Sequence, residues 1–243
     1  MSAAGRVADD RGGAADEAGQ MSLAPRVAVV GAGAWGTTIA AILARREPTL
    51  LLAHSPATAE RIEATGRNEP RLPGIVLPPL LRATADPGEL AAARDLVVFA
   101  IPSAHLRAEV ERLAGSLAPE ADVLSVVKGP EQGTLRRMSE VIAEAAGRPP
   151  DRIAALSGPN LALEIARGLP ASAVVASRSA DLAARVVARL GRKRFRLYVN
   201  DDVLGVELCG ALKNVLAIAA GAVDELGWGD NGKAGLITRG LAE

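Results

Sequence analysis

Short runs of apolar residues alternate with longer stretches of helical composition along most of the chain. Six such runs span residues 26–30, 49–53, 95–101, 122–127, 152–156 and 171–176, and residues 195–199 are a candidate for a further strand. Runs that are apolar at every position are typical of strands buried on both faces, as in parallel sheets whose connections are helices. The pattern therefore predicts a doubly wound α/β fold.

Both ends of the chain depart from this pattern. The first twenty residues contain Val7 as their only large aliphatic side chain, so they can bury too little apolar surface to offset the entropy of ordering. We expect residues 1–24 to form a disordered tail. Towards the other end, Asp201 and Asp202 are suited to cap a long helix that runs to about Leu226. We place the α/β domain at residues 25–200 and the start of a helical domain at residues 201–243.

The long helix contains the longest apolar run of the chain, from Val203 to Val223. Glu207 and Lys213 interrupt that run, and a membrane-spanning helix tolerates two such charges poorly. We therefore predict a buried helix of a soluble protein and no membrane span.

Composition narrows the kinds of ligand. The 243 residues contain 28 Lys and Arg against 28 Asp and Glu, so no excess charge favours binding to nucleic acid or to an anionic membrane. Apolar residues make up 49% and aromatic residues 2%, which predicts an aliphatic core. One cysteine, Cys209, and two histidines, His54 and His105, cannot build a disulfide framework or a Cys/His zinc site. We expect no metal, and a reducing, cytoplasmic location.

A glycine-rich turn, GAGAWG at residues 31–36, joins the first predicted strand to a helical stretch. Gly31 permits a tight turn, Gly33 permits a pyrophosphate to approach the backbone, and Gly36 permits close packing of helix on strand. The phosphate would lie at the helix N-terminus. The turn predicts a Rossmann-type dinucleotide site, and the alternative is a glycine-rich turn with a purely structural role.

The end of the second predicted strand bears on the choice of cofactor, because a ribose-binding acidic residue is expected there for NAD. Residues 50–55 read LLLAHS and contain none. His54 and Ser55 are candidate donors to the 2′-phosphate of NADP, and the alternative is two solvated loop residues. We predict a cofactor that is NAD or NADP, with NADP accepted at least as readily.

Two further strand ends carry candidate ligand groups. Lys128 directly follows an apolar strand, which suits an anionic substrate or a cofactor phosphate; a surface lysine is the alternative. The turn from Ser157 to Asn160 follows another strand and opens a helix. Its backbone amides are candidates for holding a polar ligand, and the alternative is a turn with a helix cap.

The long helix places one polar arc, Glu207, Gly210, Lys213, Asn214 and Ala217, among aliphatic positions. The two small residues of the arc leave room beside Lys213 for a small ligand. Two interpretations are open for this lysine: a buried amine whose lowered pKa suits proton transfer, or a side chain that reaches solvent.

The motifs occur in a family-specific order: GAGAWG at 31–36, LPGI at 72–75, IPS at 101–103, VKG at 127–129, SGP at 157–159, GVELCGALKNV at 205–215 and LITRGLAE at 236–243. In this series the sequence resembles the bacterial NAD(P)-dependent sn-glycerol-3-phosphate dehydrogenases. The resemblance covers residues 26–243.

The resemblance implies reversible hydride transfer between a nicotinamide cofactor and dihydroxyacetone phosphate, which gives sn-glycerol 3-phosphate for phospholipid synthesis. It makes Lys213 the proton donor or acceptor, and it assigns Lys128, Gly158 and Asn160 to the substrate. The implied cofactor contacts are Gly31, Gly33, Ala34, Trp35, Gly36, His54, Lys128 and Ala162. A homodimer is a candidate assembly.

Three departures from the family pattern bear on these expectations. Ala34 stands where the family often has Ser, and Asn160 where it often has Ser or Thr, so a hydroxyl hydrogen bond is absent or replaced at each position. The family also continues beyond residue 243 through a helical domain that carries substrate-binding residues, so we expect this second domain to be incomplete and catalysis to be absent or weak.

The alternatives to this enzyme are two. One is a truncated, catalytically inactive dinucleotide-binding module. The other is a dehydrogenase of a different small hydroxy acid, and Lys128 together with the Lys213-Asn214 pair argues against it.

Overall fold

The computed structural model describes residues 24–242. The predicted disordered tail, residues 1–24, lies outside the described residues except for its last position. The strands are β1 (Val27–Val30), β2 (Thr49–Leu52), β3 (Leu81–Thr84), β4 (Leu96–Phe99), β5 (Asp122–Ser125), β6 (Ile153–Ser157), β7 (Ala171–Ser177) and β8 (Phe195–Asn200). The α-helices are α2 (Ala34–Leu43), α3 (Pro56–Thr65), α4 (Ser103–Leu113), α5 (Met138–Ala145), α6 (Ala162–Ala166), α7 (Ala180–Leu190), α8 (Val203–Glu225) and α9 (Gly229–Ala242).

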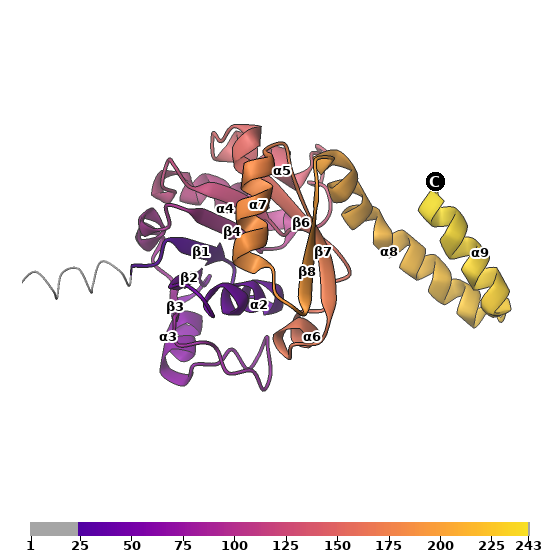
Figure 1. Cartoon of the computed structure of the whole chain (residues 1–243), viewed down its shortest axis with the longest axis horizontal. Coiled ribbons are helices and arrows are strands. Elements are labelled where there is room, and N and C mark those ends of the chain that lie inside the picture. Colours follow the sequence, from indigo (N-terminus) through magenta and orange to yellow (C-terminus); the bar gives the residue numbers. More distant parts are fainter. Residues whose placement is uncertain (1–23, 243) are drawn as a thin grey trace, which may run out of the picture.

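Within the described residues eight strands form one sheet, in the order β3-β2-β1-β4-β5-β6-β7-β8 (Figure 1). The chain builds outward from β1 in one direction through β2 and β3, and then returns to build the other half from β4. The strand order therefore reverses between β1 and β4, and in such sheets ligands bind outside the carboxyl ends of the strands at that point. The predicted doubly wound, Rossmann-type fold is confirmed.

Two features of the sheet differ from the sequence-based expectation. The edge strand β3, with the sequence LRAT, was not predicted, because an edge strand with exposed positions lacks a continuous apolar run. The sheet is parallel from β3 to β6, but β7 pairs antiparallel with β6 and β8 runs parallel with β7, a change of direction that the sequence did not indicate. A continuous apolar run reports burial on both faces and carries no information about strand direction.

Aliphatic side chains pack on both faces of the sheet, as the composition predicts. Along β1, Val27 and Val29 join the apolar cluster that includes residues of α2 and α7, whereas Ala28 and Val30 join the cluster that includes residues of α4 and α5. Successive strand residues point to opposite faces, so one short apolar strand supplies both layers of the core.

The last two helices extend away from the sheet as an antiparallel pair (Figure 1). The predicted cap is present, because the Asp202 side chain accepts a hydrogen bond of 2.8 Å from the Gly205 N–H. An ion pair of 2.8 Å between Lys233 and Asp224 links α9 to α8.

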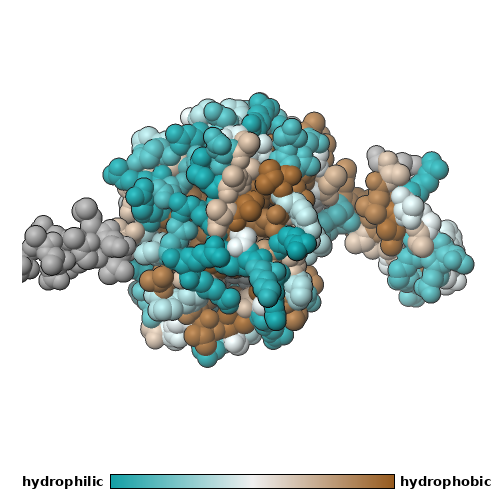
Figure 2. Space-filling view, in the orientation of Figure 1, coloured by the Kyte–Doolittle hydropathy of each residue, from teal (hydrophilic) through white to brown (hydrophobic). Residues whose placement is uncertain are grey.

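The prediction that this long helix is buried is wrong. Of α8, only Val203, Gly210 and Val223 are buried among the described residues. Large apolar side chains of α8 are exposed. The space-filling view shows apolar surface where α8 and α9 face each other (Figure 2). The exposed large ones on α8 are Leu204, Leu208, Leu212, Val215 and Ile218. By length and composition α8 also qualifies as a membrane-crossing helix, so the expected absence of a membrane span stays a prediction.

Candidate active site

The glycine-rich turn leaves β1 and enters α2 within three residues, and two of its glycines are sterically required. Gly31 has φ +110°, and a Cβ there would lie 2.6 Å from the Ala100 carbonyl oxygen. A Cβ on Gly36 would collide with the Gly31 carbonyl oxygen. Beside Gly33, in contrast, a Cβ would meet nothing within 4 Å. The turn is therefore tightly packed at Gly31 and Gly36, which we call its back, and open beside Gly33, which we call its front.

The N-terminus of α2 opens onto the same space. Gly33 is its N-cap residue and supplies no side-chain hydrogen bond to the helix. The Thr37 N–H bonds the Gly33 carbonyl oxygen at 2.9 Å, which leaves the N–H groups of Ala34, Trp35 and Gly36 as the orphan donors of the first turn. Such donors and the positive end of the helix dipole favour an anion, phosphate included.

A cavity of about 520 Å³ lies beside the turn, between the ends of β1, β2 and β4. Gly31 and His54 line it, together with Glu109 and Arg112 of α4. Arg112 donates to the Glu109 carboxylate at 3.0 and 2.6 Å, and this hydrogen bonding holds the pKa of Glu109 below its usual value, with a smaller contribution from His54. A carboxylate thus lines the cavity although residues 49–59 contain none.

Two lysines converge on the turn that follows β6. Lys128, half-buried after β5, donates to the Gly158 carbonyl oxygen at 2.7 Å. Burial and, second, the positive charge of Lys213 lower the pKa of Lys128. Lys213 on α8 is exposed and lines a cavity together with Ser157, Gly158 and Gly210, so of its two interpretations the buried one is wrong. The two positive charges therefore lie within electrostatic reach of each other near the turn that follows β6.

The turn after β6 is held against β7. A Cβ on Gly158 would lie 2.8 Å from the Ser172 carbonyl oxygen, so only glycine permits this approach. Asn160 donates its Nδ2 to the same Ser172 oxygen at 3.0 Å. Its Oδ1 atom is buried and accepts no hydrogen bond from any described residue. Asn160 therefore keeps one unused acceptor at this turn.

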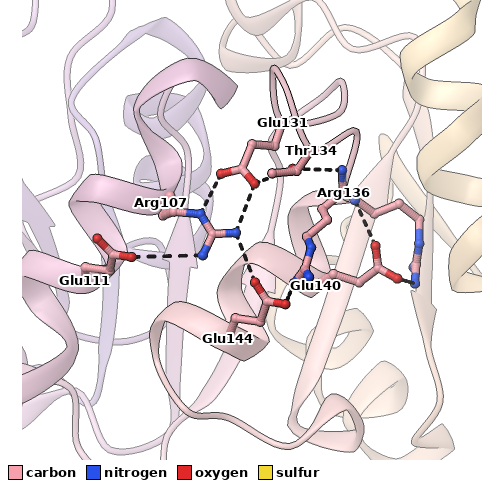
Figure 3. Close-up of polar contacts among 8 residues, drawn as sticks. Arg107, Glu111, Glu131, Thr134, Arg136, Glu140 and Glu144 are labelled. Carbon is pink, nitrogen blue, oxygen red and sulfur yellow. Dashed lines mark hydrogen bonds and ion pairs between the residues drawn. The ribbon is translucent and has the colours of Figure 1, made fainter.

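An ion-pair network fixes the loop that continues from Lys128 (Figure 3). Arg107 on α4 donates to both oxygens of Glu131 in the loop, at 2.7 and 2.9 Å, and to Glu144 on α5 at 3.0 Å. Thr134 also donates to Glu131, at 2.6 Å. These donors lower the pKa of Glu131 to about 2. The loop is thus tied to helices on both sides.

Comparison with known sequences identifies the family of this site. The sequence model described as NAD-dependent glycerol-3-phosphate dehydrogenase N-terminus matches residues 26–183, and its C-terminus counterpart matches residues 202–243. The chain belongs to this dehydrogenase family. The resemblance in the ordered motifs is thereby confirmed.

Individual members of the family agree closely. A glycerol-3-phosphate dehydrogenase (NAD(P)+) of Streptomyces avermitilis is 46% identical over 224 residues, which are 92% of this chain and 67% of the relative. One of Thermobifida fusca is 48% identical and is covered over 66% of its length. The crystal structure of glycerol-3-phosphate dehydrogenase from Coxiella burnetii has 36% identity and a TM-score of 0.80, over 89% of this chain and 66% of that one. The chain spans about two thirds of the length of these relatives.

The predicted dehydrogenase residues fall into two groups. Gly31 and His54 share one cavity, and the glycine-rich turn continues from Gly31 into α2. Lys128, Gly158 and Lys213 form the second group. The other predicted residues line neither of these two cavities.

Trp35 and Ala162 have packing roles beside the turn. The Trp35 ring meets the Phe195 ring edge to face, with centroids 6.4 Å apart, and belongs to the apolar layer. The Ala162 carbonyl oxygen accepts from Thr38 on α2 at 3.2 Å, which ties α6 to the dinucleotide-binding helix. Among residues 24–242 no group of three or more His, Cys, Asp and Glu side chains could hold a metal ion.

Sequence reasoning missed several residues that shape the site. Glu207, interpreted as part of a polar ligand face, accepts hydrogen bonds from Ser139 and Arg137 at the N-terminus of α5, and so anchors α8 to the α/β domain. Asn68, in the irregular segment between α3 and β3, is completely buried behind the glycine-rich turn. Asn68 stands between charged neighbours in a loop and gives no periodic signal. The partners of Glu207 lie on a different element, so neither contact was visible in the sequence.

Proposed function

We propose that this protein is an NAD(P)-dependent oxidoreductase that interconverts dihydroxyacetone phosphate and sn-glycerol 3-phosphate. The physiological direction is reduction, in the cytoplasm, to supply phospholipid synthesis. The observation that carries the proposal is the convergence of Lys128 and Lys213 on the Gly158 turn, at the carboxyl edge that also holds the glycine-rich turn. The names of the relatives support the same activity.

The residues of the first group fit a dinucleotide. The uncapped N-terminus of α2 and the open space beside Gly33 suit a diphosphate, and the cavity at His54 suits the adenosine end. When bound, the nicotinamide supplies the hydride. The chain itself contributes binding, orientation and charge.

The second group fits the substrate. In reduction the Lys213 ammonium donates a proton to the carbonyl oxygen, and in oxidation its amine accepts one from the alcohol. One N–H of the Lys128 ammonium donates to the Gly158 carbonyl oxygen. Its other N–H groups remain available to the substrate phosphate or to the negative charge that develops on the substrate oxygen. Asn160 holds the Gly158 turn against β7 through its bond to Ser172, and so positions this turn for the substrate.

The two groups imply a division of labour along the chain. We assign dinucleotide binding to residues 25–200, which also supply Lys128 and Gly158 to the substrate, and the rest of substrate binding to a helical unit that begins with residues 201–243. The exposed apolar side chains of α8 and α9 support a homodimer as the assembled form.

The direct test mixes the purified protein with dihydroxyacetone phosphate and NADPH or NADH, and follows the loss of reduced nicotinamide. Turnover that falls in a Lys213→Ala variant supports the proposal. A protein that binds the dinucleotide but turns over neither triose phosphate nor glycerol phosphate would instead be the non-catalytic binding module.

A further inference from the structure

Asn68 is a polar side chain with no exposed surface, in a segment without regular structure. Its Nδ2 donates to the Ala32 carbonyl oxygen at 2.9 Å and to the Thr37 hydroxyl oxygen at 2.8 Å. The first acceptor belongs to the glycine-rich turn and the second to α2, so one amide group joins both parts of the predicted phosphate site.

The bond to Ala32 fixes the direction of the neighbouring N–H. The peptide bond between Ala32 and Gly33 is planar and trans, so its carbonyl and its N–H point in opposite directions. Asn68 holds the carbonyl from behind, and the Gly33 N–H consequently points away from it. That N–H has no backbone acceptor among the described residues, and the space beside Gly33 is open.

The cost of this arrangement argues for a role beyond packing. The Asn68 Oδ1 atom is buried and has no hydrogen-bond partner among the described residues. Buried polar atoms without partners are rare in folded proteins. Turning the amide over would set its oxygen against the Ala32 carbonyl, so the fold keeps both N–H groups on their acceptors and leaves the oxygen unpaired.

We propose that Asn68 is a positioning residue for the dinucleotide: by holding the Ala32 carbonyl it aims the Gly33 N–H at the cofactor diphosphate. Asn68 itself stays behind the turn and does not touch the ligand. This inference rests on the proposed dinucleotide site, and it predicts that binding weakens when the side chain behind the turn changes, although no atom in front of the turn is altered.

The test compares the dissociation constants of NADPH for the wild type, Asn68→Ala and Thr37→Val, measured by nicotinamide fluorescence. A hydrogen bond to a charged group contributes enough that misdirecting it weakens binding about 10- to 100-fold in Asn68→Ala. Thr37→Val removes one of the two acceptors and should weaken binding less. Ser177→Ala is the matched control, because Ser177 is a buried hydroxyl that bonds the Ile153 carbonyl on the far strands of the sheet.

A second readout separates positioning from loss of stability. In the wild type the NMR signal of the Gly33 amide should shift strongly on addition of NADPH, and in Asn68→Ala this shift should shrink. Asn68→Ala and Ser177→Ala should both lower the melting temperature, but only the former should change affinity and the Gly33 signal. Equal affinities for the two variants, or an unchanged Gly33 shift, would overturn the inference. A wild type that binds no dinucleotide would instead refute the proposed cofactor site.

Discussion

The ammonium group of Lys128 donates a hydrogen bond of 2.7 Å to the carbonyl oxygen of Gly158. This contact joins the segment after β5 to the turn after β6, and it holds a flexible side chain at one place on the sheet edge. A lysine ammonium has three donors, so the remaining ones stay available to an anionic ligand. The lysine is thus fixed before any ligand arrives.

The proximity of the two lysines is testable by titration. Replacing Lys213 by Met removes the positive charge that helps to lower the pKa of Lys128, so that pKa should rise. It should stay below the ordinary value, because burial is the larger cause and is unchanged. NMR titration of the Lys128 side chain measures the effect, and Lys193→Met, an exposed lysine outside the site, serves as control. An unchanged pKa in Lys213→Met would place the two amines too far apart to cooperate.

Removal of either amine should affect catalysis differently. General acid or base assistance contributes about 10²- to 10⁴-fold, so in a version extended with the family's helical domain Lys213→Ala should lose turnover by that order while its affinity for NADPH stays nearly unchanged. Lys128→Ala should weaken substrate binding as well as turnover, because this lysine is assigned to the phosphate of the substrate or to the negative charge that develops on it. Steady-state kinetics and a separate cofactor titration measure both effects. Near-wild-type turnover in Lys213→Ala would disprove its role in proton transfer.

The open space beside Gly33 should be needed by the ligand and not by the fold. Gly33→Val should therefore remove dinucleotide binding while the protein stays folded, since a Cβ there meets nothing within 4 Å. Gly115→Val is the matched control, at an exposed glycine whose Cβ likewise meets nothing. Calorimetric titration with NADPH and circular dichroism measure the two properties. Equal affinity in wild type and Gly33→Val would refute the placement of the diphosphate.

Cofactor choice should depend on Glu109. We expect NADP(H) to be accepted at least as readily as NAD(H), because residues 49–59 contain no acidic side chain and Arg112 neutralises Glu109. Glu109→Gln should shift the preference further towards NADP(H), by about 2- to 5-fold for a partly exposed charge. Arg112→Gln should shift it the opposite way. Specificity constants for both cofactors test this, and a strong wild-type preference for NAD(H) would contradict it.

Acid should weaken the loop that carries Lys128. The pKa of Glu131 is about 2 in the folded protein against 4.5 ordinarily. A carboxyl whose pKa is lowered by folding stabilises the folded protein at any pH above the pKa that it has in the unfolded chain. That stabilisation is fully present above about pH 4.5 and is lost as the pH falls towards 2. Glu131→Gln should be less stable at neutral pH and less sensitive to acid in this window. Denaturant unfolding from pH 6 to 3 measures it, with the exposed Glu60→Gln as control.

The strands that are buried on both faces, such as β1 and β4, were predictable because every one of their positions is apolar. The edge strand β3 lacks such a run of apolar positions. The burial of α8 was mispredicted, because an apolar helix reads the same whether or not a neighbour covers it. The glycine-rich turn was predictable since its steric demands are local. The roles of Asn68, Glu109 and Glu207 were not, because each depends on a contact between segments distant in sequence.

The reversal at β7 has a consequence for the second lysine. Because β7 and β8 run against the preceding strands, the last residue of β8, Asn200, lies across the sheet in register with Val30 at the end of β1, and the chain leaves β8 near the carboxyl edge. Helix α8 therefore starts beside β6 and runs past the end of that strand before it extends away from the sheet.

The first turns of α8 lie along β6. Val203 packs with Ala155 in the middle of β6, and Gly210 meets Ser157 at the end of that strand. From Val203 to Lys213 the helix rises about 15 Å at 1.5 Å per residue, which carries the amine past the end of β6 to the cavity at Gly158. Insertion of a single residue before Gly210 would rotate every later side chain by about 100° and turn Lys213 away from Lys128. The register of one helix on one strand sets the distance between the two amines.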